Sequence, residues 1–101
     1  MRAVNNETFD SEVVSSGRQV LVDFWAPWCV KCSTMVPTLS AISESEVPGW
    51  EILSVDVEQN PQLATDYAVM SLPTLLVFRA GEVTNRATGL LTKAQILDLL
   101  G

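Results

Sequence analysis

Residues 19–32 read QVLVDFWAPWCVKC, and this stretch decides the fold class. The segment Gln19–Trp25 is rich in β-branched and aromatic residues and is mostly apolar on both faces. Such a pattern is typical of a strand that is buried between two layers of helices. A helix is expected to follow at 29–46, and Pro37 within it predicts a kink. Both cysteines of the chain therefore lie at the junction of a buried strand and a helix.

Six further elements are expected outside this stretch. Strands and helices alternate early in the chain, which favours parallel pairing there, whereas the short turn at 80–82 predicts an antiparallel hairpin. An α/β fold with a central mixed sheet and helices on both faces accommodates both kinds of pairing. The helices are expected at 8–16, at 61–67 and from 92 onward, and the strands at 51–57, 74–79 and 83–88.

Local signals place the ends of these helices. Thr8 is expected to cap the first helix and Gly17 to end it. Asn60 as the cap and Pro61 as the first helical residue predict the start of the next one. The pattern Thr92-x-x-Gln95 is a capping box, which predicts the start of the last helix.

Composition limits the class of protein. A chain of 101 residues, 48% hydrophobic and 18% charged, indicates a globular protein with a single domain over 1–101. Its net charge is −6 and its six basic residues are scattered, so no nucleic-acid partner is expected. No apolar run could span a bilayer or form a signal-peptide core, which predicts a soluble cytoplasmic protein without a membrane partner. Nothing in the sequence signals a dimer, so a monomer is expected.

The two cysteines admit three interpretations: half of a metal site, two inert buried residues, or a reversible disulfide. Structural zinc takes four Cys or His ligands, and this chain offers two cysteines and no histidine. No metal and no cofactor is therefore expected. The position at a strand-to-helix junction argues against inert cysteines, since free N–H groups at the start of a helix stabilise a thiolate.

A dithiol–disulfide exchange site is the interpretation that we favour. Cys29 is expected to have a lowered pKa at the start of the helix and to act as the attacking sulfur. Cys32 lies one turn later on the same face, at about 5–6 Å between side-chain carbons, and would resolve the mixed disulfide. Asp23 interrupts an apolar strand, and its burial predicts a raised pKa and a role as proton acceptor for Cys32. The alternative for Asp23 is a strand-end carboxylate bonded to backbone.

The chain resembles the thioredoxin family. The resemblance implies a thioredoxin fold, with a four- to five-stranded mixed sheet flanked by about four helices, and a cytoplasmic protein-disulfide reductase activity. The residues that carry it are Phe9, VDFWAPWC at 22–29, Cys32, Pro37, Asn60–Pro61, LPTLLVF at 72–78, Gly81 and Gly89.

The resemblance also implies a substrate-binding edge. Leu72–Pro73 would be a cis peptide that faces the cysteines, and the backbone of Leu72 would pair with an extended segment of the substrate. Trp28, Pro73 and the region of Gly89 would complete an apolar rim. Trp25 is expected either to pack beneath the site or to contact substrate.

Two positions depart from the family pattern. Val30 and Lys31 stand between the cysteines in place of the usual glycine and proline, and Ser54 stands where the family tends to place a lysine. Lys31 is either a solvated side chain or a cation that favours the Cys29 thiolate, so Val30 and Lys31 are expected to tune the redox potential. Loss of a nearby cation should raise the pKa of Asp23 further.

Three functions remain open from the sequence. The first is a reductase of disulfide-containing target proteins, recycled by a thioredoxin-reductase-type electron donor that uses NADPH or ferredoxin. The second is a disulfide oxidant or isomerase with a raised potential. The third is a thioredoxin-like binding module whose cysteines are incidental.

Overall fold

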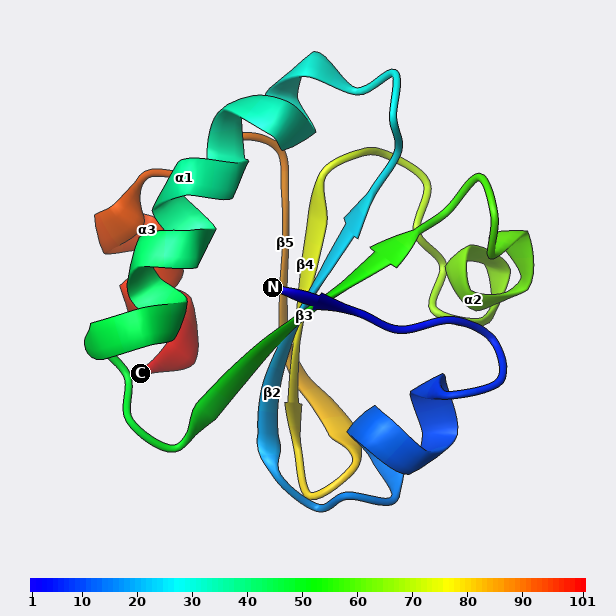
Figure 1. Ribbon diagram of the computed structural model, residues 1–101, viewed down its shortest axis with the longest axis horizontal. Helices are drawn as coiled ribbons and strands as arrows, with labels where there is room; N and C mark the ends of the chain where they lie inside the picture. The colour runs from blue at the N-terminus through cyan, green and yellow to red at the C-terminus, as the bar shows by residue number, and fades with distance from the viewer.

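The computed structural model describes the backbone of residues 1–101 and all side chains except those of residues 43–45. One mixed sheet lies at the centre, with helices on both of its faces (Figure 1). The strands are β1 (Arg2–Ala3), β2 (Gln19–Trp25), β3 (Trp50–Asp56), β4 (Thr74–Arg79) and β5 (Glu82–Thr88). The helices are the π-helix η1 (Asp10–Val14), α1 (Val30–Ser45), α2 (Pro61–Asp66) and α3 (Lys93–Leu100). The expected fold class is confirmed.

The sheet has five strands in the order β1-β3-β2-β4-β5. The pairs β1–β3 and β2–β3 are parallel, whereas β2–β4 and β4–β5 are antiparallel. The predicted hairpin is therefore confirmed, and its turn needs a glycine. Gly81 has a φ of +81°, and a Cβ atom there would lie 2.6 Å from the carbonyl oxygen of Val14. The hairpin thus packs closely against the end of η1.

Each face of the sheet carries its own apolar core because β2, β3 and β4 alternate their buried side chains between the two faces. Helices α1 and α3 cover one face, and η1 and α2 cover the other (Figure 1). The first core contains Leu21, Met35, Leu39, Ile42, Ile52, Leu75, Val77, Ile96 and Leu100. The second contains Val4, Phe9, Val13, Val20, Val22, Phe24, Leu53, Val55, Leu63, Leu76 and Phe78.

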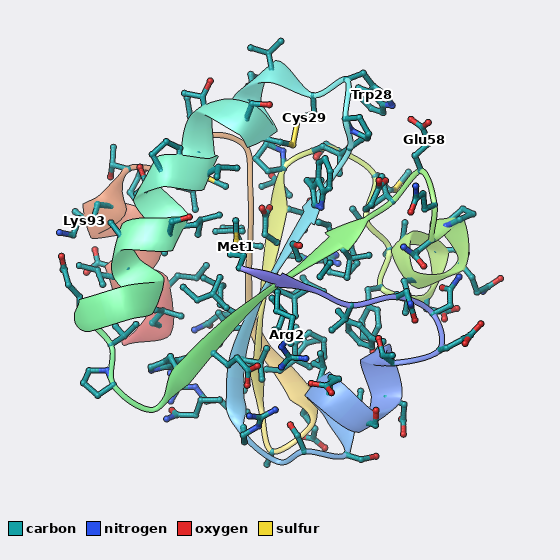
Figure 2. The ribbon with its side chains drawn as sticks, viewed as in Figure 1. Met1, Arg2, Trp28, Cys29, Glu58 and Lys93 are labelled. Carbon is teal, nitrogen blue, oxygen red and sulfur yellow. A yellow bond between two sulfur atoms is a disulfide. The ribbon has the colours of Figure 1, made fainter. Side chains whose placement is uncertain are left out.

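Helix α1 begins after Cys29 and contains Pro37 without ending there. It follows the end of β2 through a short loop (Figure 1), and Cys29 in this loop lies near one edge of the molecule (Figure 2). The capping box of α3 is present as predicted, with Thr92 and Gln95 each bonding to the other's backbone N–H. Over the part of the chain that is described, the helices are too short or too polar to cross a membrane.

Of the two predicted helix starts, the one at Thr8 is wrong and the one at Asn60–Pro61 is confirmed in position. The Thr8 hydroxyl accepts a hydrogen bond from the backbone N–H of Asn5, and the first helix begins later, as the π-helix η1. Asn60 is the cap residue of α2 and Pro61 is its first residue, as predicted, but the Asn60 side chain makes no capping bond to the described helix. Its amide instead donates to the carbonyl of Asp56 and accepts from the N–H of Asn6. Tertiary contacts with the N-terminal segment thus take the place of a local cap.

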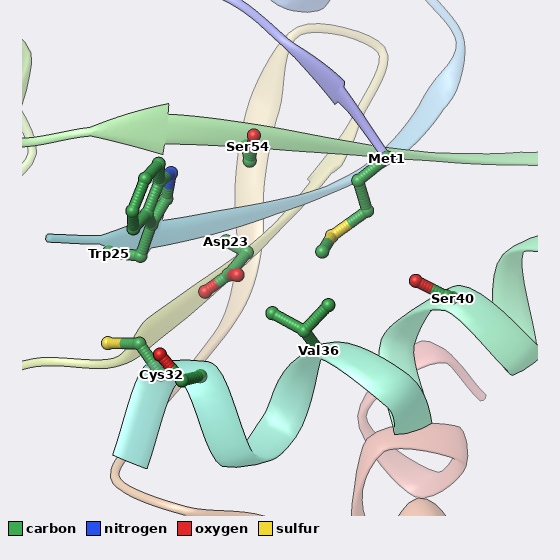
Figure 3. Close-up of a pocket in the computed structure, with 8 residues that line it drawn as sticks. Met1, Asp23, Trp25, Cys32, Val36, Ser40 and Ser54 are labelled. Carbon is green, nitrogen blue, oxygen red and sulfur yellow. The ribbon is translucent and has the colours of Figure 1, made fainter. Parts of the chain in front are cut away.

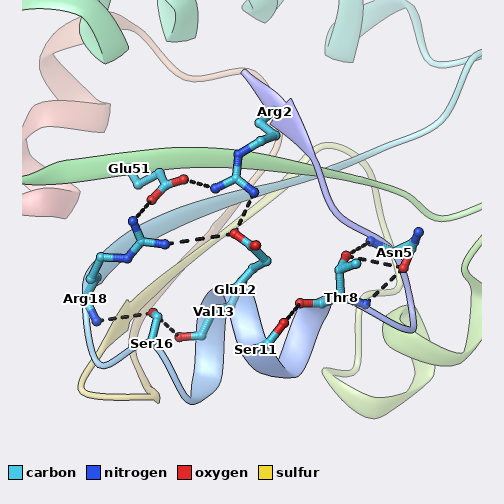
Figure 4. A network of polar contacts seen from close by, with 9 residues as sticks. All are labelled: Arg2, Asn5, Thr8, Ser11, Glu12, Val13, Ser16, Arg18 and Glu51. Atoms are coloured by element: carbon cyan, nitrogen blue, oxygen red, sulfur yellow. Dashed lines mark hydrogen bonds and ion pairs between the residues drawn. The ribbon is translucent and has the colours of Figure 1, made fainter.

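Strand β1 was not expected from the sequence. It has two residues and pairs with Leu53 and Ser54 of β3. Arg2 forms ion pairs with Glu12 of η1 and Glu51 of β3, and Arg18 approaches the same two carboxylates (Figure 4). The network connects the N-terminal segment to the sheet edge. Such exposed ion pairs contribute little to the free energy of unfolding. They orient the N-terminal segment beside β3, but they add little to its stability.

Candidate active site

The cysteine pair lies at the first turn of α1. Cys29 is the cap residue, and its Sγ atom accepts a hydrogen bond of 3.2 Å from the backbone N–H of Cys32. The two sulfurs form a disulfide, with the Cα atoms 5.3 Å apart. Cys29 is 8% exposed and Cys32 is 2% exposed. The first sulfur therefore meets the free N–H groups of the helix, and it is the more exposed of the two.

Asp23 lies beneath this pair in the middle of β2. It is 1% exposed, and it stands in register between Ser54 of β3 and Leu75 of β4. Its carboxyl group points toward the start of α1, where Cys32 lies (Figure 3). Its Oδ1 atom has no hydrogen-bond partner within the described residues. Burial raises the pKa of Asp23 from 3.8 to about 7 because the charged form loses hydration.

The surroundings of Asp23 do not match a strand-end carboxylate bonded to backbone. A strand-end carboxylate bonded to backbone would have partners for both oxygens, and it would lie at the end of β2. Asp23 instead sits inside the strand with one oxygen unpaired. A carboxyl group with a pKa near neutrality exchanges its proton in the pH range where thiols react.

The loop before β4 lies beside the cysteine pair. The Leu72–Pro73 peptide is cis, as the resemblance implied. Leu72 packs against the apolar cluster of Ala26, Cys29 and Cys32. The N–H of Gly89 donates a 2.8 Å hydrogen bond to the carbonyl of Pro73. Gly89, which was expected at the apolar rim, is thus bonded to this loop.

The aromatic residues near the cysteines divide into two environments. Trp28 is 68% exposed and projects into solvent beside Cys29 (Figure 2). Trp25 is half-buried, packs against the cysteine cluster and lines the cavity next to Asp23. Of the two expectations for Trp25, the surroundings of its side chain match packing beneath the site. Val30 is 79% exposed, and Lys31 is exposed beside it.

A cavity of about 250 Å³ beside Asp23 was missed from the sequence. Ser33, Val36 and Ser40 of α1 line one wall, and Met1 and Ser54 line the other (Figure 3). The signal that could have found the helical wall is the i, i+3, i+7 spacing of these three residues, which places them on one helix face. The opposite wall had no local signal, because it depends on how the strands pair.

A disulfide between two cysteines at the start of a helix, above a buried carboxyl group, defines a thiol–disulfide oxidoreductase of the α/β class. Comparison with known proteins agrees with this class. The family model described as Thioredoxin matches residues 1–101. The chain belongs to the thioredoxin family.

Individual relatives cover nearly the whole chain. A thioredoxin of Streptomyces clavuligerus is 41% identical over 99 residues, which span 96% of this chain and 90% of the relative. A thioredoxin of Acidithiobacillus ferridurans is 35% identical over 97 residues, with coverages of 96% and 90%. Thioredoxin 1 of Nostoc sp. (strain PCC 7120) is 35% identical over 97 residues, with coverages of 96% and 91%.

Proposed function

We propose that the protein reduces disulfide bonds of cytoplasmic target proteins, with Cys29 as the attacking and Cys32 as the resolving sulfur. The observation that carries this proposal is the asymmetry of the pair. Cys29 caps α1 and accepts the N–H of Cys32, whereas Cys32 lies deeper, on the side of Asp23. An attacking thiolate needs access and stabilisation, and a resolving thiol needs a base.

The steps follow from this placement. The Cys29 thiolate attacks one sulfur of the target disulfide, which forms a mixed disulfide and releases the first target thiolate. Asp23 takes the proton of the Cys32 thiol. The Cys32 thiolate then attacks the Cys29 sulfur, closes the disulfide and releases the second target thiolate. The two electrons that reduce the target come from the two cysteine sulfurs.

The target is proposed to bind along the loop before β4. An extended segment would pair with the backbone of Leu72, and Trp28, Pro73 and Gly89 would form the apolar rim around it. The exposure of Trp28 and the packing of Leu72 against the cysteines support this assignment. Recycling of the disulfide is assigned to a thioredoxin-reductase-type donor, because the relatives that match nearly the whole chain are named thioredoxins.

The test is to trap the intermediate. With a disulfide-bonded protein such as insulin as the target, Cys32→Ser should accumulate a covalent mixed disulfide, because the resolving sulfur is absent. Cys29→Ser should form none and should not reduce insulin. Trapping by Cys29→Ser but not by Cys32→Ser would reverse the two roles. Failure of the wild-type protein to reduce insulin, with dithiothreitol or a thioredoxin reductase as donor, would contradict the proposed activity.

A further inference from the structure

The segment that joins β5 to α3 carries part of the proposed target-binding rim. The N–H of Gly89 is bonded to the carbonyl of Pro73, which fixes one end of the segment to the loop before β4. Leu90 is 50% exposed, whereas Leu91 is half-buried and packs against the core that α1 and α3 cover. The segment thus runs from the rim into the core within three residues.

The other end of this segment is bonded to Met35 of α1. The N–H of Leu91 donates a 3.5 Å hydrogen bond to the Met35 Sδ atom, where the segment passes behind the first half of α1 (Figure 1). Among the described residues, this sulfur is the one partner of that N–H. A backbone N–H that is withdrawn from water needs an acceptor, and a thioether sulfur is a weak one. A hydrocarbon side chain of similar size would leave this donor unpaired.

Met35 belongs to the part of α1 that carries the cysteine pair. It lies three residues after Cys32, one turn later on the same face of the helix. Its side chain is 1% exposed and belongs to the core that also contains Leu39 and Ile96. Close packing leaves a buried side chain few alternative positions, so the sulfur atom is fixed relative to the backbone of α1. The bond therefore joins the rim segment to the helical turn that follows Cys32.

We propose that Met35 is a positioning residue for target binding, whose thioether holds residues 89–91 against the turn of α1 that follows Cys32. The inference rests on the proposed function, in which Gly89 belongs to the rim that receives the target. Met35 acts through the rim in this scheme and takes no part in the exchange of electrons. Without the bond, the segment would sample other positions, and target binding would have to order it again at a cost in affinity.

The test removes the sulfur and keeps the size of the side chain. Met35→Leu replaces one apolar side chain by another of similar volume, so the core should stay packed. Leu39→Met is the matched control: Leu39 is fully buried in the same core, one turn farther along α1, and its substitution changes the shape of that core without removing an acceptor. The measurements on each protein are KM and kcat for insulin, the rate with a small aryl disulfide, and hydrogen exchange of the Leu91 N–H by NMR.

Met35→Leu should raise KM for insulin about threefold with little change in kcat, because the loss of one weak hydrogen bond affects binding and not chemistry. The Leu91 N–H should exchange several-fold faster than in the wild type. The rate with the aryl disulfide should be unchanged, since a small molecule has no extended segment to place along the rim. Leu39→Met should keep wild-type values in all of these measurements.

Three results overturn the proposal. The first is a wild-type KM for insulin in folded Met35→Leu. The second is a fall in kcat with both disulfides, which would place Met35 in the chemical step. The third is an equal rise of KM in Leu39→Met, because packing and not the sulfur atom would then be the cause.

The unsubstituted protein gives a further test that needs no variant. The Leu91 N–H should exchange more slowly than the Leu90 N–H, to which the described residues offer no acceptor, and equal protection of the two overturns the proposed bond. Failure of the proposed function has a different signature. The wild-type protein would then not reduce insulin, while the Leu91 N–H would still be protected from exchange.

Discussion

Asp23 is a residue whose chemistry lowers the stability of the fold. Its pKa is about 7 in the folded protein and 3.8 ordinarily, so between these values the folded protein holds a proton that the unfolded chain has released. The free energy of unfolding therefore falls as the pH rises through this window, and the loss is complete above about pH 7. The gap between the two pKa values corresponds to about 4 kcal/mol.

Asp23→Asn, which is neutral at every pH, should unfold with a higher free energy than the wild type at pH 8, by up to about 4 kcal/mol. At pH 4 the wild-type carboxyl group is already protonated in the fold, and the difference should be small. Urea unfolding of the oxidised proteins at both pH values checks this prediction. An equal advantage of the variant at pH 4 and pH 8 would show that charge burial is not its cause.

Val30 and Lys31 occupy the first helical turn and face solvent. Val30 is 79% exposed, and Lys31 is exposed on the first turn of the helix that Cys29 caps. We therefore expect them to change the potential of the reaction and not its path. An ammonium near the thiolate favours the reduced form, and about 1.4 kcal/mol of such stabilisation raises the potential by about 30 mV.

The variant Val30→Gly/Lys31→Pro should have a potential more negative than the wild type by about 30 mV, measured by equilibration with a dithiothreitol redox buffer. Lys93→Gln is the control, since Lys93 pairs with Glu46 at the far end of α1. Lys93 lies far from Cys29 in Figure 2. Equal redox potentials in the double variant and the wild type would contradict the proposal that Val30 and Lys31 tune the potential.

At the scale of elements, local signals predicted some boundaries well. The interpretation of 19–25 as a buried strand and of 74–79 as a second strand matches β2 and β4 residue for residue. The capping box at Thr92 is also confirmed, because it needs contacts only within one turn. Strand β1 gave no such signal: two residues form a strand only because β3 presents an open edge to them.

The candidate site was also predicted only in part: its cysteines and Asp23 were found, and its cavity was not. Cys29 and Cys32 are three residues apart, and Asp23 precedes Cys29 by six residues and is marked by its apolar neighbours, so the sequence alone placed them near one another. The cavity depends on the register that sets Asp23 opposite Ser54 and on the face that α1 turns toward the sheet. The spacing of residues along α1 marks the helix face, whereas the strand register is a product of packing that no local pattern encodes.

The loop between α2 and β4 is held by side chains from other elements. The Arg86 guanidinium of β5 donates to the carbonyls of Tyr67 and Ala68, which follow the last turn of α2. Farther along the loop, the Thr74 hydroxyl donates to the carbonyl of Ser71 at 2.7 Å. These bonds fix the backbone that leads to Leu72, the proposed substrate edge.

Arg86→Gln should loosen this loop and weaken substrate binding before it affects chemistry. Loss of about 1 kcal/mol, within the range for one hydrogen bond, would raise KM for insulin about fivefold with little change in kcat. Arg18→Gln is the matched control, because Arg18 is exposed and pairs with Glu51 away from the loop. A fall in kcat at constant KM would instead place Arg86 in the chemical step.

At the scale of the whole molecule, the disulfide sits at the end of a central strand that is buried between two cores. Strand β2 pairs with both β3 and β4, and its side chains contribute to the cores on both faces. This packing holds Cys29 and Cys32 within bonding distance, with their Cα atoms 5.3 Å apart. Because most of the buried packing lies in the two cores, we expect the protein to stay folded when the bond is reduced.

The bond should nevertheless stabilise the oxidised fold in a measurable way. Closing a loop of four residues removes about 2 kcal/mol of chain entropy from the unfolded state, so the oxidised protein should unfold with a free energy higher by that amount. Guanidinium unfolding with and without dithiothreitol measures the difference, and the variant Cys29→Ser/Cys32→Ser should show none. The same quantity appears in the redox equilibrium, because folding and disulfide formation share one thermodynamic cycle. The folded dithiol should therefore have a potential about 40 mV more negative than the same dithiol in the unfolded chain. An oxidised protein that unfolds with the same or a lower free energy than the reduced protein would show that the fold does not favour the disulfide and that the cysteine pair is not preorganised for closure.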